Sequence, residues 1–334
     1  MGRRDFHRTG PVHWSETYPL ILVVLVFGLA GSFLLVSSHA ATPAQRAEAE
    51  NGTATVAAAV SDATASGGQA VKFAAAARQT TNCLPPLSQT MTNAVSHLCG
   101  FPDATNTGVP PGTQLTPSGS ITVTQDGAVV QNLDINGNIT VLANNVTIKN
   151  TRITSGDYYP IRYFDDNNTG LLVEDTEIIG TNSDVTAGMS FSSFKLLRVN
   201  IHGAADGVKV EDDTDVEDSY IHDLAIGEDT HNDGLQSTGG SNITINHNSI
   251  ILSADVSSCM QFGNENGDSS NVTISNNLFD GGGYCVRIYG NGTNNKVLNN
   301  HFGHDEAYGV YDITDPGVTV TGNVWDDSGD AKNS

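Results

Sequence analysis

Two short stretches of sequence decide the fold: "ITINHNSI" at residues 243–250 and "VTISNNLF" at residues 272–279. Both have apolar residues at their first, third and eighth positions and a polar residue at their fifth. Alternation with a period of two indicates short β-strands. The pattern recurs from about residue 128 onward, in stretches at 146–153, 171–178, 194–201, 214–221, 295–302 and 318–325.

The stretches follow one another at intervals of 20–29 residues, and such internal repetition indicates a solenoid. Leucine-rich repeats have a similar period, but they need leucine where this chain has mostly valine and isoleucine. Each repeat also contains a second short strand, such as "VKV" (208–210), "LQS" (235–237) or "MQF" (260–262). Two or three strands per turn predict an all-β parallel β-helix, with equivalent residues of successive turns about 4.8 Å apart.

The N-terminus has the features of an export signal. Three arginines within the first eight residues precede an uncharged apolar run at 20–36, and small residues follow it. We therefore predict that residues 1–40 are a signal peptide cleaved after Ala40 or an N-terminal membrane anchor. In both cases the rest of the chain is extracellular or at the cell surface.

Three further segments follow the signal. Residues 41–80 are rich in Ala, Thr and Ser and predict a linker. Residues 81–112 predict an N-terminal cap, because one apolar helical face in "PPLSQTMTNAVSHLC" suits a short helix held by a Cys83–Cys99 disulfide over the open end of the solenoid. Residues 113–330 form the predicted β-helix, and no feature indicates more than a monomer.

The remaining cysteines, Cys259 and Cys285, lie at equivalent positions of successive turns. Their predicted separation falls within the range of a disulfide, and an exported protein permits one. A net charge of −22 excludes nucleic acid as a partner. An acidic polysaccharide would need cations or a local basic groove to bind such an acidic protein. Because the chain is rich in oxygen ligands, we predict calcium as a cofactor.

The candidate site lies where "ADGVKVED" (205–212) stacks on "NDGLQSTG" (232–239). Equivalent positions bring together two carboxylates, a lysine and an imidazole. The predicted catalytic residues are Lys209, Asp233, Asp206 and His231. The predicted substrate-binding residues are Gln236, Gln261, Arg287 and Tyr311 in one outward column and Glu211 at the next outward position. The predicted calcium ligands are Asp206, Asp233 and Glu211.

Several interpretations of this cluster stay open. Lys209 acts as a base toward a sugar C5 proton while the carboxylates hold calcium, or Asp206 and Asp233 act as acid and base on a glycosidic bond. The alternative is structural, since Asp-Gly is also a turn signal. His202 and His222, each following the last apolar residue of a repeat, favour a structural stack.

These features resemble two groups of proteins. "AEAENGTATVAAAVSDATASGGQAVKFAAA" resembles the opening hairpin of carbohydrate-binding β-sandwich modules. The repeat, with "LRVNIHGAADGVKV" and "YIHDLAIGEDTHNDGLQSTGGSNITINHN", resembles the bacterial right-handed parallel β-helix proteins of the pectin-lyase-like superfamily over about residues 100–330. That superfamily implies polysaccharide lyases and glycoside hydrolases of uronic-acid polymers, and also non-catalytic surface proteins.

Individual branches of the superfamily fit less closely. Polygalacturonases have an Asp that Asp233 would match, but they need an Asp pair where this chain has Ser257 and Ser258, and a Gly-His-Gly at residues 281–283, which are glycines here. The Arg-x-Pro-x-x-Arg element of pectate lyases is absent. We expect an exported β-helix that binds a cell-surface or extracellular polysaccharide and cleaves it, the alternative being a non-catalytic glycan-binding or adhesive solenoid.

Overall fold

A computed structural model describes residues 57–61, 69–73, 100–163, 168–228 and 230–334. The chain divides into two compact units, Met1–Gln79 and Thr80–Ser334. In the first unit, β1 (Ala57–Ser61) and β2 (Gln69–Phe73) form an antiparallel hairpin within the predicted linker. In the described ranges no helix is long and apolar enough to span a membrane. The predicted export signal at 1–40 and the cap helix with Cys83 and Cys99 lie outside those ranges.

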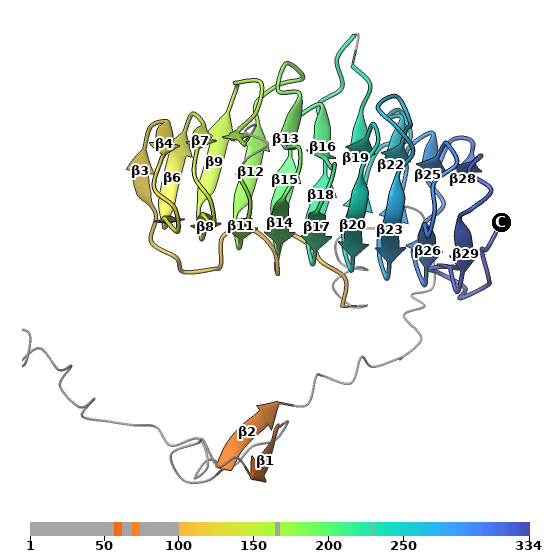
Figure 1. Cartoon of the computed structure of the whole chain (residues 1–334), viewed down its shortest axis with the longest axis horizontal. Coiled ribbons are helices and arrows are strands. Elements are labelled where there is room, and N and C mark those ends of the chain that lie inside the picture. Colours follow the sequence, from red (N-terminus) through yellow and green to blue (C-terminus); the bar gives the residue numbers. More distant parts are fainter. Residues whose placement is uncertain (1–56, 62–68, 74–99, 164–167, 229) are drawn as a thin grey trace, which may run out of the picture. The chain divides into compact units, whose positions relative to one another are not determined.

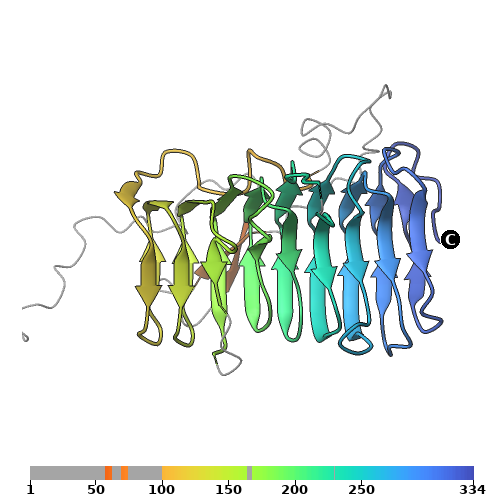
Figure 2. The ribbon, with the colours of Figure 1, turned by 90° about the horizontal axis from the view of Figure 1, so that it is seen from above.

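The second unit is a parallel β-helix, whose rungs lie side by side along its length (Figures 1 and 2). Its ten-stranded sheet contains β3 (Thr116–Ser118), β6 (Leu133–Asn136), β9 (Arg152–Ser155), β12 (Glu177–Gly180), β15 (Asn200–His202), β18 (Tyr220–His222), β21 (Ser249–Ile251), β24 (Leu278–Asp280), β27 (His301–Phe302) and β30 (Val324–Trp325). Its nine-stranded sheet contains β5 (Val129–Gln131), β8 (Thr147–Lys149), β11 (Leu171–Glu174), β14 (Phe194–Leu197), β17 (Thr214–Glu217), β20 (Ser241–Asn246), β23 (Ser270–Ser275), β26 (Lys296–Leu298) and β29 (Thr319–Thr321).

Two shorter sheets complete the rungs. The three-stranded sheet contains β4 (Ile121–Val123), β7 (Ile139–Val141) and β10 (Ile161–Arg162). The six-stranded sheet contains β13 (Ala187–Met189), β16 (Asp206–Lys209), β19 (Asp233–Ser237), β22 (Ser258–Phe262), β25 (Tyr284–Ile288) and β28 (Gly309–Ile313). Strand pairing is parallel throughout these sheets. The repeat pattern therefore predicted the all-β parallel solenoid correctly.

The core is a set of apolar columns inside the rungs. Ile178, Ile201 and Ile221 are adjacent in register on the ten-stranded sheet, and Ile250, Phe279 and Phe302 continue the column. All six are fully buried. Each rung covers the apolar interior of its neighbour, so burial of apolar surface stabilises the stack as a whole.

A single left-handed residue turns the chain from the nine-stranded to the ten-stranded sheet in every rung. These residues, with positive φ angles of 46–71°, are Asn132, Asn150, Asp175, Arg198, Asp218, His247, Asn276, Asn299 and Gly322. Asn, Asp and Gly adopt this conformation at low cost. Where the residue is larger, it pairs with the preceding rung: His247 Nδ1 lies 2.6 Å from Asp218 Oδ1, and Arg198 Nε lies 2.7 Å from Asp175 Oδ1.

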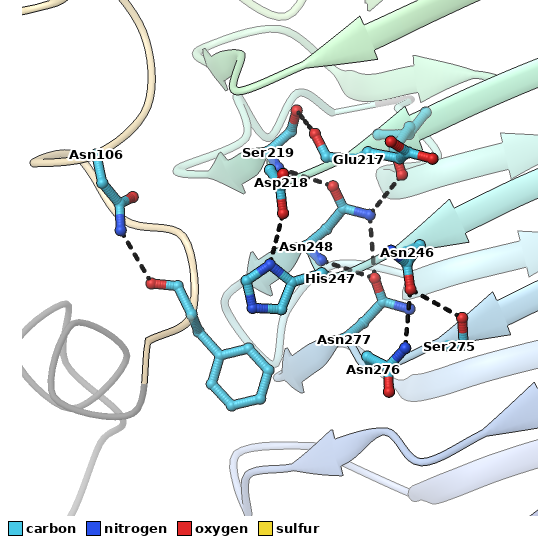
Figure 3. A network of polar contacts seen from close by, with 12 residues as sticks. Asn106, Glu217, Asp218, Ser219, Asn246, His247, Asn248, Ser275, Asn276 and Asn277 are labelled. Carbon is cyan, nitrogen blue, oxygen red and sulfur yellow. Dashed lines mark hydrogen bonds and ion pairs between the residues drawn. The ribbon is translucent and has the colours of Figure 1, made fainter. Parts of the chain in front are cut away.

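The residue after this turn faces inward, and in the later rungs it is a fully buried asparagine (Figure 3). Asn248 Nδ2 donates to Asn277 Oδ1 (3.0 Å), Asn277 Nδ2 donates to Asn300 Oδ1 (2.9 Å), and Asn300 Nδ2 donates to Asn323 Oδ1 (3.0 Å). The same oxygens accept the backbone N–H groups of the preceding asparagines at 2.8–2.9 Å. This asparagine ladder satisfies backbone groups that the turn leaves without a strand partner.

The ladder ends on a chain segment that folds back. Asn333 Oδ1 accepts the backbone N–H of Asn323 at 3.1 Å, as the ladder oxygens do in the rungs before it. Lys332 N donates to Asn323 O at 2.7 Å, and Val324 forms a bridge with Ala331. Residues 331–333 therefore pair with Asn323 and Val324, where the chain turns into β30.

We predict that Asn277→Ala lowers the free energy of unfolding by about 2–4 kcal/mol, because the Asn248 side-chain and backbone donors lose their common buried acceptor. Urea denaturation followed by circular dichroism measures the change. The exposed Asn291→Ala is the matched control. Equal stability of the two variants would contradict a structural role for the ladder.

Residues 100–112, here called the strap, differ from the predicted cap. The predicted cap covered the open end of the solenoid, whereas the strap runs along the outer side of the ten-stranded sheet before the chain enters β3 (Figure 1). Phe101 stacks on His247 at 5.8 Å and meets the ring of His301 edge-on at 5.1 Å. Gly108 N donates to Arg198 O at 2.9 Å, nearer the start of the solenoid.

The physical reason for this course is an apolar strip on the outer side of the sheet. Tyr220 and Leu278 occupy outward positions next to the inward Ile221 and Phe279, yet both are buried. With the buried Phe101 they lie outside the interior core cluster. The strap itself is held compactly, since Asn106 Nδ2 donates to Phe101 O at 3.3 Å (Figure 3).

We predict that Phe101→Ala releases the strap without unfolding the solenoid, since the loss of a buried phenyl ring costs about 3 kcal/mol. Hydrogen exchange and limited proteolysis within residues 100–112 should accelerate while the exchange of β17–β26 is unchanged. Gln114→Ala, an exposed position beyond the strap, serves as the control. Uniformly faster exchange over the whole solenoid would show that the strap is part of the global folding unit.

Candidate functional site

The outward row of the six-stranded sheet carries the predicted binding residues. Lys209 pairs in register with Gln236, Gln236 with Gln261, and Gln261 with Arg287. Successive members lie on neighbouring strands, about 4.8 Å apart. The row therefore presents two cations separated by two amides along the solenoid axis.

The prediction for Tyr311 was wrong, because Asp312 is the residue paired with Arg287. Tyr311 pairs with Val286 and faces the core, where its ring meets Phe302 at 5.4 Å. A slip of one residue moves a side chain to the other face of a strand. The sequence "VYD" resembles "VRI", but it is Tyr311-Asp312-Ile313 that takes the place of Val286-Arg287-Ile288.

Asp206 and Asp233 begin β16 and β19, where the backbones approach closely. A Cβ atom on Gly207 would lie 2.3 Å from Gly234 O, and one on Gly234 would lie 2.4 Å from Cys259 O. The Asp-Gly pair is therefore needed for strand packing as well as for any chemistry. Both carboxyl groups are buried, with Asp233 at 0% exposure.

A polar network joins these carboxylates to the outward row. Lys209 Nζ lies 2.7 Å from Asp206 Oδ2 and donates a short hydrogen bond to Gln236 Oε1. Gln236 Nε2 donates to Asp233 Oδ2 (3.1 Å), and Asp233 N donates to Asp206 Oδ1 (2.9 Å). Burial raises the pKa of Asp206, and the charge of Lys209 opposes that rise.

His231 stands over this network with its ring 56% exposed. Its Nδ1 lies 3.0 Å from Asp233 Oδ2, and this hydrogen bond raises the pKa of His231. Ser258, which was not among the predicted site residues, donates a short hydrogen bond to Asp233 Oδ1. Asp233 thus orients an exposed imidazole whose other nitrogen contacts no residue of the described ranges through a hydrogen bond.

The buried carboxylates do not fit the hypothesis of an acid and base acting on a glycosidic bond. Asp206 and Asp233 have 3% and 0% exposure, and their oxygens already accept protein hydrogen bonds. They also do not fit calcium: Lys209 neutralises Asp206, and Glu211 Oε1 accepts from Thr238 N (3.2 Å) and Oγ1 (2.9 Å). Within the described residues, no group of three or more His, Cys, Asp or Glu side chains could hold a metal ion.

Arg287 lies in a second polar group that the sequence did not indicate. Its Nε donates to Tyr289 Oη at 2.8 Å and lies 3.3 Å from Asp312 Oδ2. Tyr289 Oη donates to the same carboxylate. The guanidinium also lies 5.8 Å from the centre of the Tyr284 ring. These contacts fix the position of the cation on the outer face.

The predicted disulfide between Cys259 and Cys285 is not formed, and both residues are buried free thiols. Their strands are in register, with Ser258 opposite Tyr284 and Met260 opposite Val286. Both sulfur atoms point to backbone carbonyls: Cys259 Sγ lies 3.3 Å and Cys285 Sγ 3.6 Å from Gly281 O. Hydrogen bonding to Cys259 and burial raise the pKa of the Cys285 thiol.

The other histidines near the cluster in sequence lie elsewhere in space. His202 and His222 stack at 4.9 Å on the ten-stranded sheet, and Tyr220 stacks on His222 at 4.1 Å. The acidic residues of the stretch 211–218 form hydrogen bonds between rungs. For example, Asp212 Oδ1 accepts the backbone N–H of Ser241 at 2.7 Å. Both groups have structural contacts and lie apart from the His231 network.

Comparison with known proteins agrees with this architecture. A family model described as "Right handed beta helix region" matches residues 185–331. The match spans β13 to β30 and agrees with the parallel strand stacks, which make the described solenoid an all-β parallel β-helix. No curated protein matches the chain.

We predict that Asp233→Asn lowers the pKa of His231, because the hydrogen-bonded carboxylate is the largest cause of its elevation. Titration of the imidazole by two-dimensional NMR measures both proteins. The His202 and His222 resonances should be the same in the variant, which checks that the fold is intact. An unchanged His231 titration would exclude the proposed pairing with Asp233.

Proposed function

We propose that the outer face of the six-stranded sheet binds a uronate-containing polysaccharide and cleaves it by β-elimination, with His231 as the base. One observation supports this reaction above others: an exposed imidazole is hydrogen-bonded through Nδ1 to a fully buried carboxylate, Asp233, at 3.0 Å. This arrangement fixes the ring and leaves Nε2 available to accept a proton.

The elimination uses few groups. His231 Nε2 takes the C5 proton of a uronate, the C5–H electrons form the C4–C5 double bond, and the C4–O bond breaks. The departing oxygen keeps the electron pair of the broken C4–O bond and takes a proton from solvent water. Asp233 stabilises the imidazolium that forms, and Ser258 and Gln236 hold Asp233 in place.

Lys209 and Arg287 are assigned to substrate carboxylates. They are three strands apart in register, about 14 Å along the axis. Gln236 and Gln261 lie between them and offer amide groups to sugar hydroxyls. Because Lys209 is in an ion pair with Asp206 at 2.7 Å, its geometry fits a charged anchor better than a neutral amine base.

The second candidate function is glycan binding without cleavage. The observation that favours it is the saturation of the network, since Asp206, Lys209, Gln236 and Asp233 form a closed ring of hydrogen bonds. Such a network also serves a purely structural purpose. In both functions the protein acts outside the cell as a monomer, and calcium has no assigned role.

We predict that the exported part of the chain releases unsaturated products from at least one polymer among polygalacturonate, alginate, chondroitin and hyaluronan. His231→Ala should lower kcat at least ~100-fold through loss of general base catalysis, with binding retained. Ultraviolet absorbance of the C4–C5 double bond measures the product. His304→Ala, another exposed histidine, is the control.

Two results would separate the candidate functions. Product formation that depends on His231 supports elimination. Binding of a polymer without unsaturated product, with or without added calcium, would leave the glycan-binding function and exclude the lyase.

A further inference from the structure

Two exposed tyrosine side chains lie in loops on one edge of the solenoid. Of the large hydrophobic residues that the described ranges expose, Tyr158, Ile226 and Tyr308 lie in the loops before β10, β19 and β28. Tyr158 is 62% exposed and Tyr308 is 77% exposed. Single exposed hydrophobic residues are common, but their placement on loops leading into the three-stranded and six-stranded sheets indicates a shared use.

Hydrogen bonds from rung to rung fix the positions of these tyrosines relative to His231. On one side, Tyr158 O accepts Thr186 N (2.9 Å), Thr186 O accepts Asp206 N (3.0 Å), and Asp206 Oδ1 accepts Asp233 N (2.9 Å). On the other side, the contacts are Ser257 N to Asn232 O (2.8 Å), Gly283 N to Ser257 O (3.0 Å) and Tyr308 N to Gly283 O (2.8 Å).

Tyr158 and Tyr308 are therefore six rungs apart, about 29 Å along the axis. His231, next to Asn232, lies in the middle rung, three rungs from each tyrosine. The row from Lys209 to Arg287 occupies the rungs between them. The base and its flanking polar side chains thus lie between two aromatic groups.

Both exposed rings are supported by other side chains. The Tyr308 ring lies 5.8 Å from the Tyr284 ring, and a Cβ atom on Gly283 would be 3.3 Å from it. Tyr158 meets the buried Tyr159 edge-on at 5.0 Å, and Tyr159 meets Phe191 at 5.7 Å. Each exposed ring is thus held by an aromatic neighbour and still presents much of its surface to solvent.

We infer that Tyr158 and Tyr308 are stacking platforms for sugar rings at the two ends of a site for a linear oligosaccharide, with the scissile unit at His231. The inference depends on the proposed function for its ligand class. An aromatic ring packs against the apolar face of a sugar while neighbouring polar groups bind its hydroxyls. A protein partner fits less well, because the row between the tyrosines is Lys, Gln, Gln and Arg and lacks an apolar centre.

Affinity electrophoresis tests the platforms without requiring cleavage. Gels contain polygalacturonate, alginate, chondroitin, hyaluronan or neutral xylan, and retardation gives the affinity. We expect Tyr308→Ala and Tyr158→Ala each to weaken binding about five- to tenfold, as loss of one aromatic stacking contact does. Tyr308→Phe should bind as the wild type does. Val129→Ala, which removes an exposed hydrophobic side chain on β5 of the nine-stranded sheet, is the matched control.

The outcomes separate this inference from the proposed reaction. Tyrosine-dependent retardation without unsaturated product supports the platforms and excludes elimination. Product formation with unchanged binding by both alanine variants overturns the platforms and leaves the reaction standing. If none of the polymers retards the wild-type protein, both proposals are wrong.

Discussion

The rest of the structure depends on one backbone constraint: each rung turns between the nine-stranded and ten-stranded sheets on a single left-handed residue. The turn has the same length in each rung, so it keeps the strands on its two sides in a constant relative register. The inward residue that follows must satisfy the backbone groups that the turn exposes, and the asparagine ladder does so from Asn248 to Asn323. The six-stranded sheet is reached through loops of different lengths, and its polar row from Lys209 to Arg287 is also in register.

Much of this fold could be predicted from sequence, because a period of two repeated every 20–29 residues leaves few alternatives to a parallel solenoid. The strap could not be predicted, since its anchor Phe101 contacts His247 and His301, which are distant in sequence. The asparagines of the ladder occupy the sixth position of the later repeats, directly after the polar residue at the fifth position. In the earlier repeats the sixth position holds Thr, Val or Ser, so the asparagine pattern is not evident over the whole chain.

The residue pairs of the candidate site could be predicted from the same repetition, but their burial could not. Stacking of equivalent repeats brings Lys209 to Gln236 and Asp206 to Asp233, and repetition alone indicates both pairs. Burial is set by the loops and not by the repeat, so the sequence could not show that Asp233 is enclosed while His231 is exposed. The prediction that Tyr311 faces outward was wrong because Val310 and Val286 look equivalent in sequence, whereas Val286 pairs with Tyr311 in the structure.

The fold-back of residues 331–333 has a consequence for assembly. A stack of rungs is a one-dimensional polymer in which each new layer is templated by the hydrogen-bonding groups of the last. Asn333 supplies the side-chain oxygen of a further layer but none of its strands, and it therefore satisfies the Asn323 amide without offering a fresh template at that turn. At this corner, one side chain provides the hydrogen bond that a further rung would otherwise provide.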